Sequence, residues 1–343
     1  MRRLAPFAAC VLLLSACAGA AVIAPAAPYA SHGWTPLAVE TRRVGLGIPG
    51  GVRLSPGVRF AGGLEILAPP GDRLHGLSDL KLLDGEVLMV SDAGDLFRAR
   101  LQFDARGRPS GLSDLRVRAL TAEDGRAFSA KPDGDAEALA ITADDGLIVG
   151  FEQRPRLWSY GSPDDIRERP RAFATPPVPG GNEGIEALAA EPDGWRVAGE
   201  SGGVWDCRPR ACVAVGEPPA TPIPVSGWRI TGMDGDPARA AWFVVQRRFR
   251  APVDMRARLR RMAEDGTFGP VLVELSLPST VDNFEGIAAV RHGDGVRLYI
   301  LSDDNSHARQ RTLLLAFDVG AGAQVVRKSS PGGEAASRPR RVR

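Results

Sequence analysis

The segment Ile185-Glu186-Ala187-Leu188, followed after a polar turn by Trp195-Arg196-Val197-Ala198-Gly199-Glu200, decides the fold because versions of it recur along the chain. Each version has an acid within a short apolar run, then a polar turn, then a longer apolar run that ends in a polar or acidic residue. The acids of the five versions are Asp79, Glu137, Glu186, Asp234 and Glu285, at intervals of 58, 49, 48 and 51 residues. This spacing is typical of one four-stranded propeller blade with its loops.

Between residues 59 and 319 no stretch shows sustained helical periodicity, and short β-rich runs bounded by Gly, Asp and Pro recur. We therefore predict an all-β chain folded as a β-propeller with five or six blades of about four strands. Stacked blades bury sheet faces that a single sheet would expose. Residues 60–67 are expected to pair with the last blade and close the ring. A sixth, more divergent blade would lie in residues 104–131 or 207–224.

The two ends of the chain are predicted to lie outside this domain. Residues 1–16 have the charged start and short apolar run of a secretory signal, and Leu14-Ser15-Ala16-Cys17 resembles the bacterial lipobox. Cys17 is therefore expected to carry a lipid anchor, the alternative being an ordinary signal cut near Ala20. Residues 17–57 are predicted to form an Ala/Pro/Gly-rich tether, residues 58–320 the propeller, and residues 321–343 a basic disordered tail.

An exported chain reaches an oxidising compartment. The residue after Cys17 favours anchoring of the lipoprotein in the outer membrane, with the protein facing the periplasm. Cys10 leaves with the signal, so Cys207 and Cys212 are expected to form a disulfide. Zinc would need two further ligands near this pair. Without the signal and tail charges the body holds 35 Lys and Arg against 40 Asp and Glu, a net charge of −5. This balance argues against a nucleic-acid partner. A monomer is expected, although the sequence does not determine the oligomeric state.

The innermost strand of each blade lines the axial channel, so acids recurring at one point of that strand should converge there. Carboxylates about 4 Å apart repel by roughly 4 kcal/mol at an intermediate dielectric. Bound Ca²⁺, raised pKa values, or Arg partners such as Arg154 and Arg247 would offset this repulsion. A second set of acids ends strands near the same face: Asp92, Glu152, Glu200, Asp303 and Asp304. Alternatively, a single acid could accept backbone N–H groups and hold blades in register.

Four motifs carry a family resemblance. They are Gly76-Leu77-Ser78-Asp79-Leu80, Asn182-Glu183-Gly184-Ile185-Glu186-Ala187-Leu188, Asp282-Asn283-Phe284-Glu285-Gly286-Ile287-Ala288, and Leu301-Ser302-Asp303-Asp304-Asn305 with Gln310-Arg311-Thr312-Leu313-Leu314-Leu315. Over residues 58–319 the chain resembles the "esterase-like activity of phytase" family of the bacterial envelope. The resemblance implies a β-propeller and hydrolysis of an ester, including phosphate esters. Propeller phytases bind several Ca²⁺ ions, but their ligand pattern is not placed residue by residue on this chain.

If phosphate esters are the substrate, bound Ca²⁺ would polarise the phosphoryl group and activate water, while basic side chains hold the charge. Glu137, Glu186 and Glu285 would then be metal ligands or bases. His307 would be a general acid, and His75 is a second candidate for that role. The expected metal ligands are Asp79, Glu137, Glu186, Asp234, Glu285 and Asp303. The expected substrate-binding residues are Arg154, Arg247 and Arg311.

Two other functions fit the same sequence. One is a non-catalytic envelope propeller that binds a ligand or a protein, and the other is a lactonase-like propeller hydrolase with one axial Ca²⁺. The stretch Gly199-Glu200-Ser201-Gly202-Gly203 satisfies the G-x-S-x-G pattern of serine hydrolases. It is discounted because that motif requires a strand turning into a helix, whereas the repeat predicts a hairpin here.

Overall fold

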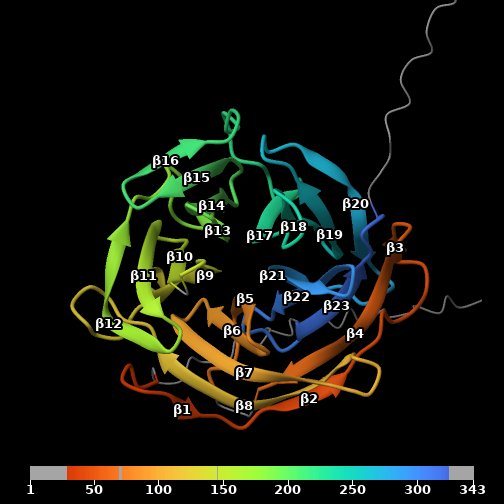
Figure 1. The fold of residues 1–343 in the computed structure, drawn as a ribbon, viewed down its shortest axis with the longest axis horizontal. Helices are drawn as coiled ribbons and strands as arrows, with labels where there is room; N and C mark the ends of the chain where they lie inside the picture. Colours follow the sequence, from red (N-terminus) through yellow and green to blue (C-terminus); the bar gives the residue numbers. More distant parts are fainter. Residues whose placement is uncertain (1–28, 69–71, 145, 324–343) are drawn as a thin grey trace, which may run out of the picture.

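The computed structural model describes residues 29–68, 72–144 and 146–323. The signal peptide, Cys17 and most of the basic tail therefore lie outside the described residues. Five sheets stand around a central axis as the blades of a propeller (Figure 1). The predicted all-β propeller is confirmed, and the number of blades is five.

Within each blade the strands follow one another outward from the axis. The innermost strands are β5 (Leu77–Leu83), β9 (Ala136–Ile141), β13 (Ile185–Glu191), β17 (Arg229–Gly235) and β21 (Asn283–His292). The second strands are β6 (Glu86–Ser91), β10 (Leu147–Phe151), β14 (Gly194–Gly199), β18 (Trp242–Arg250) and β22 (Gly295–Asp303). The third strands are β7 (Asp95–Phe103), β11 (Arg156–Ser162), β15 (Val204–Arg208), β19 (Asp254–Met262) and β23 (Thr312–Val319). The fourth strands of blades 1 to 4 are β8 (Pro109–Ala119), β12 (Asp165–Phe173), β16 (Ala211–Ala214) and β20 (Phe268–Ser276).

Blade 5 takes its fourth strand from the other end of the chain. β4 (Val58–Leu67) pairs with β23 in antiparallel register, so the predicted closure of the ring by an N-terminal strand is confirmed. The structure differs from the expected tether over residues 29–57. There β1 (Thr35–Pro36), β2 (Glu40–Arg43) and β3 (Val52–Leu54) add to the outer edges of blades 1, 5 and 4. Strands this short lack a visible pattern, but they cover exposed edges of long sheets.

The two segments considered for a sixth blade belong to neighbouring blades instead. Residues 104–131 contain β8 and lead into the short helix α1 (Lys131–Gly134) between blades 1 and 2. Residues 207–224 contain β16, the outer strand of blade 3. The predicted disulfide joins Cys207 to Cys212 across β15 and β16.

The hydrophobic core is divided into five clusters, each between two adjacent blades. Leu88 and Val90 of β6, for example, pack with Leu139 of β9 between blades 1 and 2. The second strands are apolar because blades cover them on both faces, and the run from Val87 to Val90 is completely buried. Apolar burial therefore fixes how the blades stack around the axis.

Every innermost strand carries a β-bulge near its start. The residues that the pairing skips are Ser78, Glu137, Glu186, Thr231 and Glu285. A bulge places one extra residue in a strand, kinks it and redirects a side chain. The next residue is packed tightly: a Cβ on Gly232 would lie 1.9 Å from the Glu285 carbonyl oxygen. The five bulges thus mark equivalent positions in the innermost strands of all five blades.

Asp79 and Asp234 do not share the position of the three glutamates. Asp79 lies one residue past its bulge and Asp234 three residues past its own. Asp79 Oδ2 accepts hydrogen bonds from Lys81 Nζ at 2.9 Å and from the Leu139 backbone N–H at 2.9 Å. Lys81 Nζ also donates to the Met233 carbonyl at 3.2 Å. Both aspartates therefore tie blades together, which is the alternative role considered for a single acid.

Replacing Lys81 with Met should destabilise the protein by about 3–5 kcal/mol, because Asp79 would remain buried without its partner. Urea unfolding at pH 7.5 measures the loss. The double variant Asp79→Asn with Lys81→Met should recover part of it. Arg126→Met removes an ion pair with Asp124 in which both side chains are exposed, and it should cost at most about 1 kcal/mol. Equal effects of Lys81→Met and Arg126→Met would contradict this role of the axial pair.

Candidate functional site

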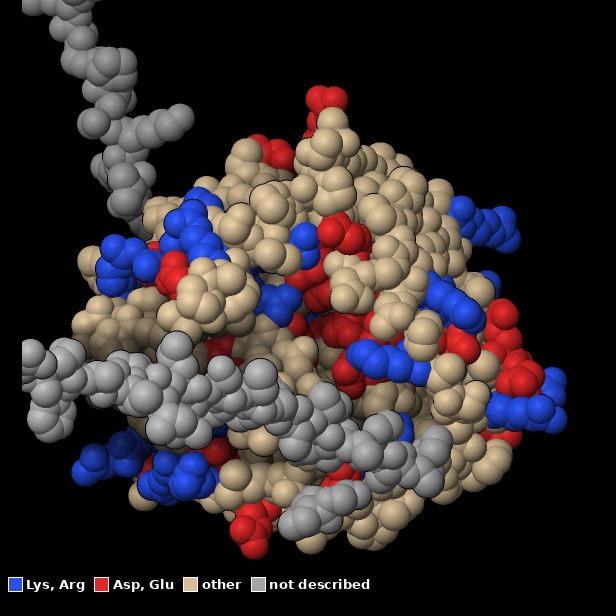
Figure 2. Space-filling view, turned by 180° about the vertical axis from the view of Figure 1, so that it is seen from behind, with Lys and Arg blue, Asp and Glu red and all other residues tan. Residues whose placement is uncertain are grey.

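A cavity of about 410 Å³ lies where the innermost strands begin, and it is strongly acidic. Figure 2 shows acidic side chains gathered in a central hollow on the face opposite to the view of Figure 1. The carboxylates that line the cavity are those of Asp92, Asp135, Glu137, Glu152, Glu183, Glu186, Glu200, Glu285 and Asp303. The cations that line it are Lys131, Arg229 and Arg247.

Two positions of the blade repeat deliver most of these acids. The bulges turn Glu137, Glu186 and Glu285 into the cavity. The end of the second strand supplies a further acid in four blades, listed here in blade order: Asp92, Glu152, Glu200 and Asp303. Blade 4 differs, because it has Thr231 at the bulge and Arg247 near the end of its second strand. The cavity is therefore acidic on most sides and basic on the side of blade 4.

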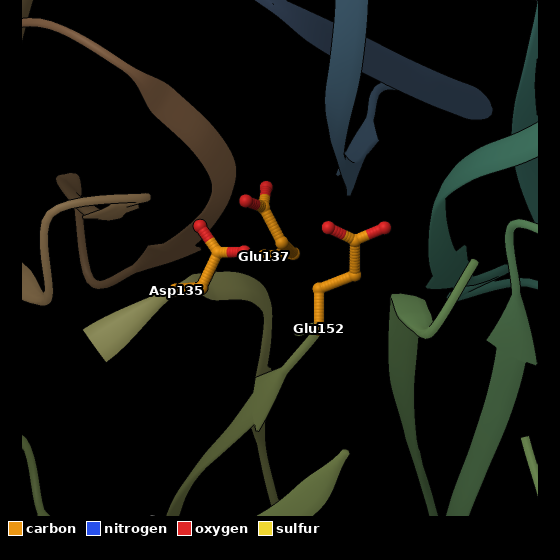
Figure 3. Close-up of side chains that lie close together, drawn as sticks. All are labelled: Asp135, Glu137 and Glu152. Carbon is orange, nitrogen blue, oxygen red and sulfur yellow. The ribbon is translucent and has the colours of Figure 1, made fainter. Parts of the chain in front are cut away.

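Two groups of three carboxylates offer oxygen atoms within 4.8 Å of one another. One group is Asp135, Glu137 and Glu152, whose carboxyl groups converge in Figure 3, and the other is Glu152, Glu186 and Glu200. Glu152 belongs to both. Asp135 is 1% exposed, and its Oδ2 has no hydrogen-bond partner among the described residues. A buried carboxylate oxygen without a donor calls for a cation or a proton.

Burial and mutual repulsion raise the pKa values of five acids of the cavity. Burial raises the pKa of Glu152 to about 8 and that of Glu285 to about 7. The pKa values of Glu137 and Glu186 stand well above the usual range of a glutamate, first because both are buried and then because other carboxylates surround them. The pKa of Asp303 is raised for the same reasons. Without a cation the cluster is partly protonated at neutral pH.

The three cations are each bound to carboxylates of the cavity. Lys131 Nζ lies 2.6 Å from Asp92 Oδ2 and 2.8 Å from Asp135 Oδ1. Arg229 and Arg247 both contact Glu200, at 2.6 Å in each case.

Arg247 also reaches Glu285 Oε1 at 2.9 Å. The amide of Asn283 donates to the same oxygen at 2.8 Å. Glu285 is therefore held in one orientation, separate from the two carboxylate groups.

Several residues expected at the site lie elsewhere. Asp79 and Asp234 are outside the cavity, as described above. Arg154 pairs with Asp133 beside a second pocket. Arg311 Nε lies 3.6 Å from Asp282 Oδ2, and neither residue lines the cavity. The His307 ring accepts the backbone N–H of Arg309 and does not line the cavity.

His75 has a structural partner. Its Nδ1 lies 2.7 Å from Asp304 Oδ2, and Asp304 also accepts the Gly76 N–H and the Thr312 hydroxyl. This contact raises the pKa of His75. Both residues therefore hold the start of β5 against the end of blade 5, outside the cavity lining.

The sequence reasoning missed Asp135, Lys131 and Arg229. Asp135 stands two residues before its bulged glutamate, where blade 4 has Arg229 and blade 5 has Asn283, so a repeat aligned on the bulges would have found it. Lys131 lies in α1, which has no counterpart in the other blades among the described residues. The discounted G-x-S-x-G stretch does lie in the hairpin between β14 and β15. In the described part of the chain no helix is long and apolar enough to cross a membrane.

Comparison with solved structures finds similarity at low identity. A putative gluconolactonase matches with 14% identity and a TM-score of 0.43, over 83% of this chain and 94% of that chain. The major allergen Mala s 1 of Malassezia sympodialis matches with 17% identity and a TM-score of 0.38, over 77% of this chain and 90% of that chain. A glucose dehydrogenase matches with 17% identity and a TM-score of 0.38, over 83% of this chain and 100% of that chain. Scores this low support no functional conclusion.

Comparison with curated proteins gives no significant match. A family model does match, over residues 72–306, which includes every innermost strand and all the acids of the cavity. The resemblance noted in the sequence motifs is thereby confirmed, and this chain belongs to the phytase-like family described as esterase-like activity of phytase.

Proposed function

We propose that the acidic cavity binds a divalent cation, with Ca²⁺ expected, and that the protein hydrolyses esters of phosphoric or carboxylic acids there. The observation that carries this proposal is the pair of buried carboxylate groups that share Glu152 and open into one cavity. Family membership supports the reaction class. The proposal also explains why a folded protein keeps so many acids so close together.

The donor set fits a hard cation. Both groups of close side chains consist of carboxylates alone, and Ca²⁺ takes six to eight oxygen ligands in flexible geometry. The free Oδ2 of Asp135 is available without breaking a hydrogen bond. Asp135, Glu137, Glu152 and Glu186 would hold the cation, and Glu200 would contribute from its position against Arg229 and Arg247.

A bound cation would supply Lewis-acid polarisation of the ester oxygen. Glu285 is the proposed general base, because its pKa of about 7 matches neutral pH and Arg247 and Asn283 fix its carboxylate. It would take a proton from water as the water oxygen bonds to the acyl carbon or phosphorus. The proton then passes to the leaving alkoxide as the ester C–O or P–O bond breaks, giving an acid and an alcohol.

We further propose that the protein acts in the cell envelope, tethered by a lipid on Cys17. This rests on the signal sequence and the lipobox resemblance, which lie outside the described residues. A disulfide in the propeller agrees with an oxidising compartment.

Ca²⁺ binding to the purified protein should be saturable and should release protons, since the acids with raised pKa must ionise. Affinity should therefore rise between about pH 6 and pH 8. Calorimetry in two buffers of different ionisation enthalpy measures both effects. Glu137→Gln and Glu152→Gln should each raise Kd at least tenfold, about 1.4 kcal/mol. Glu65→Gln, a buried glutamate outside the cavity, should leave Kd unchanged.

The same acids predict how stability depends on pH. Their pKa values in the folded protein exceed the unfolded value of about 4.3. At a pH between the unfolded and the folded pKa values, the folded state therefore holds more protons than the unfolded state. In EGTA, stability should fall as pH rises from about 5 to 8, and Ca²⁺ should reverse the fall. Thermal unfolding at each pH checks this. A calcium-free protein that gains stability over this range would contradict the assigned protonation.

Replacing Glu285 with Gln should lower kcat for p-nitrophenyl acetate or p-nitrophenyl phosphate about 10²-fold or more, because the proton acceptor is lost. Ca²⁺ affinity should change much less, since Glu285 is outside both carboxylate groups. Initial rates with and without Ca²⁺, together with calorimetry, separate the two effects. Saturable Ca²⁺ binding without turnover of either ester would favour the non-catalytic binding protein.

Cys17→Ala should abolish metabolic labelling with radioactive palmitate and move the protein from the membrane to the soluble envelope fraction. Cys10→Ala is the matched control, because Cys10 precedes the expected cleavage site. Continued labelling of the Cys17→Ala chain would rule out this anchor.

A further inference from the structure

An apolar side pocket of about 260 Å³ opens next to the acidic cavity, between blades 4 and 5. It shares Glu200, Val225, Arg229, Arg247 and Asn305 with the cavity lining, so the two spaces are continuous. On the side of blade 4 its wall is formed by Phe249 and Met255, together with Arg248. A substrate reaching the carboxylates can therefore extend an apolar group into this pocket.

The hairpin of β18 and β19 creates the apolar wall. Phe249 of β18 and Met255 of β19 are directly paired, which places their side chains on one face of blade 4. β17 stops pairing at Arg229 opposite Arg247, so Phe249 lies beyond the end of the innermost strand. The pocket residues contributed by blade 5 are polar, among them Asn283 and Gln310. Met255 also packs against the apolar core between blades 4 and 5, so the apolar wall of the pocket continues that core.

The segment between blades 3 and 4 completes the rim. The Val225 carbonyl accepts the Phe249 backbone N–H at 2.8 Å, which fixes Val225 over the junction of the two spaces. The Val225 residue is 57% exposed. A cluster of apolar side chains at the mouth of a site, only partly covered, is typical of a ligand-binding surface.

The charges of the cavity disfavour a highly anionic substrate. Each cation of the cavity lining, Lys131, Arg229 and Arg247, already contacts at least one carboxylate within 2.6 Å. Arg248 lines the side pocket instead, with its guanidinium 4.8 Å from the centre of the Trp228 ring. A polyphosphorylated substrate would have to break these pairs and enter a space lined by nine carboxylates. An uncharged ester meets neither cost.

We propose that the preferred substrate is an uncharged carboxylic ester or lactone with one apolar arm, bound with the arm between Phe249 and Met255 and the ester group beside the carboxylates. This specificity rests on the proposed hydrolase function. The pocket has room for roughly nine groups of water size at ~30 Å³ each, which suits an unbranched arm of roughly six to eight carbons. Hydrolysis adds water across the acyl C–O bond and releases the carboxylic acid and the alcohol.

The first test compares p-nitrophenyl acetate, butyrate, octanoate and phosphate with the full-length, calcium-loaded protein. kcat/KM should rise at least tenfold from acetate to octanoate, because each buried methylene adds to binding. The phosphate ester should be at least a hundredfold poorer than the octanoate. Equal rates for acetate and octanoate, or a faster phosphate ester, would overturn the specificity while leaving the hydrolase proposal intact.

Variants of the wall locate the effect. Met255→Trp should fill the pocket and lower kcat/KM for octanoate at least tenfold relative to that for acetate. Phe249→Ala should enlarge the pocket and shift the preference to longer chains, which covers the case in which Met255→Trp fails to fold. Val213→Trp, at an exposed valine on β16, is the control and should change nothing. An unchanged chain-length preference in both wall variants would refute the assignment.

A binding measurement separates the pocket from the chemistry. Calorimetry with N-methyloctanamide should show saturable binding that Met255→Trp removes, while N-methylacetamide should bind too weakly to detect. Octanamide binding without turnover of any ester would keep the apolar pocket and reject the hydrolase. Turnover without octanamide binding would keep the hydrolase and reject the pocket.

Discussion

The ion pair between Asp79 and Lys81 on the propeller axis is the contact on which the rest of the structure depends. Five innermost strands meet there, so each loses water and needs a polar partner from another blade. The Asp79 carboxylate receives the backbone N–H groups of Leu139 and Ile287, and Lys81 donates to the Met233 carbonyl. Two side chains of blade 1 thereby bind blades 2, 4 and 5.

Blade 4 breaks the symmetry of the ring, and this makes one side of the cavity basic while the other sides are acidic. Five acids at the bulges and five at the ends of the second strands would repel one another without distinction. Ser78 in blade 1 and Thr231 and Arg247 in blade 4 replace three of them, and Arg229 adds a second guanidinium. Both arginines contact Glu200 and Arg247 orients Glu285, so those two acids differ in role from the cluster around Glu152. The ring therefore has a candidate cation site with a separate, oriented carboxylate beside it.

Most of the fold could be predicted from the sequence, because a buried second strand requires an uninterrupted apolar run and five such runs recur. The pairing of β4 with the last blade was predicted because propellers often close their ring with a strand from the N-terminal end. The register of the acids could not be predicted, because a bulge does not show in the alternation of apolar and polar residues. A shift of one residue moves a side chain to the other face of its strand. Asp79 was therefore grouped with Glu137, although it points to the axis rather than the cavity. Lys131 lies outside the repeat, so no repeat could reveal it.

The acids of the cavity show why the apolar pocket belongs with them. Carboxylates that hold protons at neutral pH cost free energy to ionise. A cation can bind to them only as they release those protons. A bound cation would neutralise much of the negative charge, and the lysine and the two arginines of the cavity are already paired with carboxylates. Affinity for substrate has to come from elsewhere, and the nearest surface that offers it is the apolar wall of Phe249 and Met255. The charge balance at the axis and the side chains of one hairpin thus lead to the same class of substrate.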